Sequence, residues 1–164
     1  MSATTEVVRA STIVELGPAD AFEVFTDEVD AWWRTGPRFR PGGRRGGALA
    51  FEPGPGGHLA EHYDDGAASV ELARVLAWEP GARLLLELTG PDYEPGQTTR
   101  VEIRFDAVAG GTRVSIEHTG WEAFGSDAVA RHGLSGDAFE SMLGYHWGDL
   151  LVAFGRASRA RKAA

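Results

Sequence analysis

The sequence has no cysteine, no asparagine and only one lysine. The absence of cysteine excludes disulfides, thiolate nucleophiles, iron–sulfur clusters and cysteine-based zinc sites. Because the single lysine is Lys162, no internal lysine is available to form a Schiff base or a phosphate-binding P-loop. Enzymes that depend on either device are therefore excluded.

Basic charge is also scarce, with 16 Lys and Arg against 24 Asp and Glu and a net charge of −8. Nucleic-acid binding relies on clustered basic side chains, so no nucleic-acid partner is expected. The sequence lacks both the apolar core of a signal peptide and a run of about 20 apolar residues, so no membrane span is expected. These patterns predict a cytoplasmic protein, and the arginine-rich, glycine-rich composition is typical of bacteria.

The composition suits one globular domain, with 43% apolar side chains among 164 residues. A chain of this length buries enough surface to fold without a metal or a disulfide. No repeat, long linker or low-complexity segment divides it. We therefore predict a single domain over residues 1–164, with an ordered core over about 6–156 and a short basic end.

The first third of the chain predicts a strand and a short or broken pair of helices. Residues 6–16 are rich in β-favouring side chains, and Pro18 suits a first helical turn. Apolar residues then recur at helical spacing from Phe22 to Trp33. The next segment, 34–47, has five arginines and five glycines without periodicity, which indicates a loop.

A run of antiparallel strands is predicted next, at residues 48–52, 58–63, 69–78, 83–88, 98–108 and 112–118. Glycine- and proline-rich turns separate them, which indicates a meander. Alternation is clearest from Val101 to Phe105 and from Val114 to His118, where one face is apolar and the other polar. His118 lies on the apolar face.

The last predicted element is an amphipathic helix of about five turns. Asp137 is its expected N-cap, with Glu140 completing a variant of the capping box. The apolar stripe that should cover the sheet comprises Phe139, Met142, Leu143, His146, Trp147, Leu150, Leu151 and Phe154. Basic residues at the carboxyl end suit the helix dipole.

This order of elements resembles the START-like or SRPBCC superfamily, whose Bet v-like helix-grip fold is α+β and wraps a curved antiparallel sheet of six to seven strands around the last helix. The closer resemblance is to its single-domain branch related to the activator of heat-shock-protein-90 ATPase. The residues that carry it are Ala21–Thr26, Trp32-Trp33, Arg74–Pro80, Arg83-Leu84, Val101–Phe105, Gly111–His118, Gly120-Trp121, Trp147 and Leu150-Leu151.

The resemblance implies an apolar cavity between the sheet and the terminal helix, as used across the superfamily for lipids, sterols, polyketides and aromatic ligands. His118 and His146 could present imidazoles to such a ligand as hydrogen-bond partners or as a general acid–base pair. The expected lining residues are Phe25, Trp32, Trp33, Phe105, His118, Trp121, Phe139, His146 and Trp147. Arg38 and Arg40 are the expected entrance residues.

Each feature also has a simpler interpretation. The two histidines and the aromatic residues could be ordinary core, and the arginine-rich segment could be a solvated loop. His58 and His62 would lie about 13 Å apart along a strand, too far to share a metal. No metal and no cofactor are therefore predicted, and Tyr145 and Glu61 are weaker polar candidates.

The leading hypothesis is a protein that binds a small apolar or aromatic molecule between sheet and terminal helix. One alternative is a cyclase- or dehydratase-type enzyme in which His118 or His146 is the general acid or base. A further alternative is a chaperone-associated interaction module. A homodimer is compatible with each of them.

Overall fold

The structure is a computed structural model that describes residues 6–33, 47–89, 93–125 and 127–164. Its strands lie within two residues of the predicted bounds, and two short helices follow the first strand as expected. In chain order the elements are β1 (Val8–Val14), α1 (Pro18–Asp27), α2 (Val29–Trp32), β2 (Ala48–Phe51), β3 (His58–His62), β4 (Val70–Glu79), β5 (Arg83–Leu88), β6 (Thr99–Val108), β7 (Gly111–Thr119), η2 (Trp121–Ala123), η3 (Val129–Arg131) and α3 (Gly136–Ala163).

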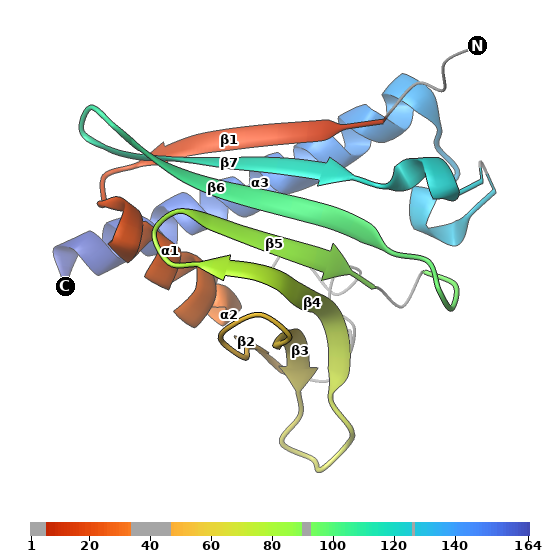
Figure 1. Cartoon of the computed structure of the whole chain (residues 1–164), viewed down its shortest axis with the longest axis horizontal. Helices are drawn as coiled ribbons and strands as arrows, with labels where there is room; N and C mark the ends of the chain where they lie inside the picture. Colours follow the sequence, from red (N-terminus) through yellow and green to blue (C-terminus); the bar gives the residue numbers. More distant parts are fainter. Residues whose placement is uncertain (1–5, 34–46, 90–92, 126) are drawn as a thin grey trace.

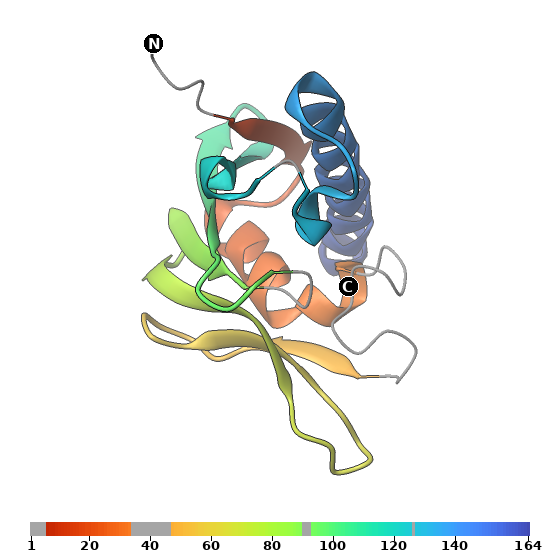
Figure 2. The same cartoon turned by 90° about the vertical axis from the view of Figure 1, so that its right-hand side faces the viewer.

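The seven strands form one antiparallel sheet in the order β1-β7-β6-β5-β4-β3-β2. The predicted meander from β2 to β7 is confirmed, and β1 pairs with β7, placing Val8 opposite His118 and Val14 opposite Thr112. The sheet curls around the helices, and α3 runs along the side formed by β1 and β7 (Figures 1 and 2). This is the α+β helix-grip arrangement that the sequence predicted.

Helices α1 and α2 close one end of the concave face. Pro18 occupies the first turn of α1, and the apolar face formed by Ala21, Phe22, Val24 and Phe25 is buried. The two helices are tied together because Trp32 Nε1 donates a hydrogen bond to the Phe25 carbonyl (3.3 Å).

The alternation on β6 and β7 is confirmed and defines the inner face of the sheet. Val101, Ile103 and Phe105 are buried, and the register places Val101 opposite His118. His118 is therefore carried on an inward-facing position among apolar side chains. None of the described helices combines the length and apolar character that a membrane crossing needs.

The predicted start of the terminal helix is wrong. The helix begins at Gly136 with Ser135 as N-cap, because the Ser135 carbonyl accepts a hydrogen bond from the Phe139 amide (3.5 Å). Asp137 is therefore inside the first turn, and no side chain caps the helix. Gly136, with φ +57, takes a left-handed conformation that an aspartate would adopt less readily.

The helix is also longer than predicted, with 28 residues or about eight turns. The apolar stripe ends at Phe154, but the basic residues that follow continue the helix. Arg161 pairs with Glu23 and Glu28 of the α1–α2 segment, and Lys162 pairs with Glu15 after β1 (2.8 Å). These tertiary ion pairs extend the helix beyond the range that apolar periodicity reveals.

Candidate functional site

The nine side chains predicted to line a ligand site lie between the concave face of the sheet and the helices. Eight are buried, and His146 is half-buried. We call this set the aromatic cluster. Its members are Phe25, Trp32, Trp33, Phe105, His118, Trp121, Phe139, His146 and Trp147.

One half of the aromatic cluster surrounds Phe25 on α1. The Phe25 ring centroid lies 5.7 Å from that of Phe105 on β6 and 4.7 Å from that of Trp32 on α2. Phe154 of α3 lies 5.5 Å from Phe25 and completes this half. The rings of Phe25 on α1 and Trp32 on α2 therefore lie between the sheet and α3.

The other half of the aromatic cluster surrounds Trp121 in η2, directly after β7. Its ring centroid lies 4.9 Å from that of His118 and 4.7 Å from that of Phe139. Trp147 contacts His118 (6.0 Å), and it also contacts Trp33 (5.6 Å) of the first half. Ring contacts therefore join residues from six elements (α1, α2, β6, β7, η2 and α3) into one continuous layer.

His118 is the polar centre of this layer and is only 3% exposed. The Trp147 indole N–H donates to its Nδ1 atom (3.1 Å), and its Nε2 atom lies 2.7 Å from Thr99 Oγ1. Because an indole can only donate, Nδ1 must be the acceptor. The proton of the neutral ring is therefore on Nε2, which donates to Thr99.

The environment keeps His118 uncharged. Burial, together with the nearby His146, lowers the pKa of His118 from 6.5 to about 3. Protonation would also turn Nδ1 into a donor facing the Trp147 N–H. His118 thus acts at neutral pH as a fixed, neutral hydrogen-bonding group with its lone pair occupied.

Trp121 has the opposite character, because its indole nitrogen has no hydrogen-bond partner among the described residues. The side chain is 2% exposed, and its Nε1 atom is buried without a hydrogen-bond acceptor. An indole N–H removed from water without an acceptor carries a substantial desolvation cost. Within the described residues, this donor has no acceptor and is surrounded by aromatic rings.

The remaining predicted residues lie at the edge of the aromatic cluster, away from it, or outside the described residues. The His146 ring lies 6.0 Å from that of Trp147 and lowers the pKa of His118, so it is the half-buried, outermost member of the aromatic cluster. Tyr145 is 79% exposed and faces solvent, whereas Glu61 is buried on β3. Arg38 and Arg40, the predicted entrance residues, lie outside the described residues.

The sequence profile of one protein family, described as activator of Hsp90 ATPase homolog 1-like protein, matches residues 15–143. The chain belongs to this family. The match runs from the residue after β1 into the first third of α3, and it includes seven of the nine members of the aromatic cluster, all except His146 and Trp147. Among curated proteins, no sequence matches the chain significantly.

Solved structures share the fold of this family member at low sequence identity. Protein MLL2253 from Mesorhizobium loti is 15% identical with a TM-score of 0.63, over 93% of this chain and 96% of that one. The Aha1 dimer from Colwellia psychrerythraea is 14% identical with a TM-score of 0.63, over 93% and 95%. DynU16, described as a protein in the dynemicin biosynthetic locus, is 19% identical with a TM-score of 0.56, over 92% and 46%.

Sequence reasoning missed Arg131 in η3, which contacts Trp121 and Phe139 of the aromatic cluster. Its side chain is 5% exposed and binds the Glu6 carboxylate (2.7 Å). It also donates to the Trp121 carbonyl (2.8 Å) and stacks over the Phe139 ring, 4.9 Å from its centroid. No periodic pattern surrounds Arg131, so nothing in the sequence singled it out.

Thr99 and Tyr93, which continue the polar chain from His118, were also missed. Tyr93 Oη lies 2.8 Å from Thr99 Oγ1. A signal for Thr99 did exist, because it is two residues before Val101 and so shares the inward face of β6. Tyr93 lies in the segment between β5 and β6, where alternation gives no information.

Proposed function

We propose that the protein binds a small aromatic or apolar molecule at the aromatic cluster, and that Trp121 Nε1 donates a hydrogen bond to an acceptor atom of that molecule. The observation that carries this proposal is the buried, unpartnered indole N–H among aromatic rings. A carbonyl or ether oxygen on a flat apolar body would satisfy the donor and stack on the neighbouring rings.

The state of His118 supports binding over base catalysis by this residue. A general base needs a lone pair that accepts a proton near neutral pH. The Nδ1 lone pair of His118 is engaged by Trp147, and its pKa is lowered to about 3. We infer that His118 positions Trp147 and Thr99 around the ligand. A catalytic role in cyclisation or dehydration would belong to His146, which is half-buried.

The proposal is tested with a matched pair of probes, 2-acetylnaphthalene and 2-ethylnaphthalene, which differ by one carbonyl oxygen. A net hydrogen bond is worth about 1 kcal/mol, so the ketone should bind about fivefold more tightly. The Trp121→Phe variant keeps an aromatic ring but lacks the donor. It should bind both probes equally, as measured by fluorescence titration, and the Trp121 indole N–H resonance should shift in the original protein.

Trp78→Phe is the matched control, because Trp78 is on β4 and its ring contacts Phe22 and Phe51, outside the aromatic cluster. It should keep the preference for the ketone. Equal affinity of the original protein for both probes, or a preference that survives Trp121→Phe, would overturn the proposal. Sedimentation velocity on the same samples tests homodimer formation, which we propose because one structural neighbour is a dimer.

A further inference from the structure

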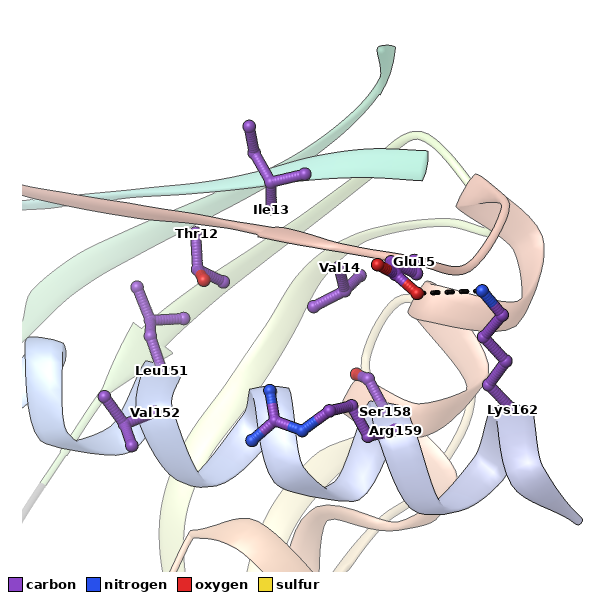
Figure 3. Close-up of a pocket in the computed structure, with 10 residues that line it drawn as sticks. Thr12, Ile13, Val14, Glu15, Leu151, Val152, Ser158, Arg159 and Lys162 are labelled. Atoms are coloured by element: carbon purple, nitrogen blue, oxygen red, sulfur yellow. Dashed lines mark hydrogen bonds and ion pairs between the residues drawn. The ribbon is translucent and has the colours of Figure 1, made fainter. Parts of the chain in front are cut away.

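A groove separates β1 from the second half of α3 (Figure 3), and none of the residues that line it belongs to the aromatic cluster. Its volume is about 310 Å³, at the lower end of the range for ligand pockets. Thr12 and Val14 point into it from β1, and Leu151 points into it from α3. Glu15, Ser158, Arg159 and Lys162 supply its polar lining.

The helical side of the groove is hollow because of two small residues. Leu151, Gly155, Ser158 and Lys162 recur at spacings of four, three and four, so they form one stripe facing β1. Gly155 has a helical conformation, and a Cβ atom built there would meet only Arg159 Nη1, at 3.8 Å. The missing side chain leaves room for the Arg159 guanidinium to lie along the helix.

Ser158 provides a polar atom without a partner at the floor of this groove. The residue is 2% exposed, and its Oγ atom has no hydrogen-bond partner in the part of the chain that the structure describes. Serine within a helix often bonds to the carbonyl one turn earlier, but Ser158 does not. Its hydroxyl is directed toward β1 (Figure 3).

Arg159 provides a positive charge that forms no ion pair among the described residues, although it lies near enough to Glu15 to help Lys162 lower the pKa of that carboxyl. Its neighbours Arg161 and Lys162 are held by Glu23, Glu28 and Glu15, whereas no described carboxylate lies within ion-pair distance of Arg159. Lys162 already neutralises Glu15, the acidic residue of the lining. The groove therefore has a net positive charge in a chain whose net charge is −8.

We propose that this groove binds a small carboxylic acid with a short apolar body. The carboxylate would pair with Arg159 and accept a hydrogen bond from Ser158, while the apolar body would pack on Val14 and Leu151. The volume limits the ligand to a short chain or a single ring. This site is separate from the aromatic cluster and does not depend on the function proposed above.

Hexanoate and 1-hexanol are the test probes, because they share an apolar chain and differ in charge. Backbone amide shifts measured by NMR should saturate with hexanoate at residues 12–15 and 151–159, and 1-hexanol should bind about tenfold more weakly. Arg159→Gln should weaken hexanoate binding about tenfold. Gly155→Leu places a side chain in the groove and should abolish the shifts.

Arg156→Gln is the matched control, because it removes the same charge from the same helix outside the groove. It should leave hexanoate affinity unchanged. An equal loss in Arg156→Gln and Arg159→Gln would show a general charge effect and overturn the proposal. Equal binding of 1-hexanol, or shifts confined to the aromatic cluster, would also overturn it.

Discussion

At the scale of single residues, hydrogen-bond partners determine what each polar group in the interior can do. His118 has a partner on each ring nitrogen and stays neutral, whereas the buried Trp121 N–H and the buried Ser158 hydroxyl have no partner within the described ranges. The first arrangement stabilises the fold. The other two are the groups that we propose for ligand recognition.

The lowered pKa of His118 predicts a pH-dependent stability. In the unfolded chain this group protonates near pH 6.5, but in the folded protein it does so only near pH 3. The unfolded state therefore binds more protons than the folded state between these pH values. The contribution of neutral His118 to the stability of the folded state is complete above pH 6.5 and is lost as the pH falls below it. The free energy of unfolding should drop by about 1.4 kcal/mol per pH unit in this window.

The measurement is urea unfolding at pH 7 and pH 5.5 for the original protein and for His118→Gln. Glutamine offers an acceptor to Trp147 and a donor to Thr99 without a titrating group. The variant should therefore lose less stability over this interval. Parallel losses in the two proteins would contradict the assignment to His118.

Two buried hydroxyls with different partners give a second test. Thr112 Oγ1 donates to the Leu16 carbonyl (2.7 Å), whereas Ser158 Oγ has no partner. Thr112→Val should lower the free energy of unfolding by about 1–2 kcal/mol, because it leaves a buried carbonyl unpaired. Ser158→Ala should leave it unchanged or raise it by up to about 1 kcal/mol. A substantial loss in Ser158→Ala, measured by urea unfolding, would show that the hydroxyl has a partner.

At the scale of elements, the connection between β7 and α3 acts as a rigid support for the site. Its described residues form the short turns η2 and η3, and Arg131 fixes it by binding Glu6 and the carbonyls of Trp121 and Phe124. Glu6 precedes β1, so this network ties the connection to the edge of the sheet. The hydrogen bond from Arg131 also lowers the pKa of Glu6.

Arg131→Leu should lower the free energy of unfolding by about 3 kcal/mol, because it leaves a largely buried carboxylate and two carbonyls without their donor. The near-ultraviolet circular dichroism of the tryptophans should weaken because Trp121 loses its anchor. Arg9→Leu is the control, since it breaks an exposed pair with Glu117 and should have almost no effect. Similar losses in both variants would mean that Arg131 contributes only surface charge.

At the scale of the whole molecule, the repeating elements were predictable and the connections between them were not. Alternation located the strands and placed His118 on the inner face, because a sheet covered on one side needs a period of two. Helical spacing and the family resemblance identified the nine members of the aromatic cluster. Arg131 and Tyr93 lie in irregular segments, where position depends on tertiary contacts that have no sequence period.

The error at the start of α3 has a similar cause. Asp137 and Glu140 have the chemistry of a capping box, but glycine backbone conformations at Gly133 and Gly136 determine where the helix begins. The far end of the helix depends on ion pairs with Glu15 and Glu23, which are more than 130 residues away in sequence. Local patterns could not reveal either effect.

The pairing of β1 with segments far along the chain affects how the protein folds while it is being synthesised. Val8 pairs with His118, and Glu15 binds Lys162 across 147 residues of sequence. β1 therefore has no partner strand until β7 has emerged, and contacts of such long range form slowly. A nascent chain that stalls before α3 carries an aromatic layer without its covering helix, which makes it prone to aggregation during synthesis.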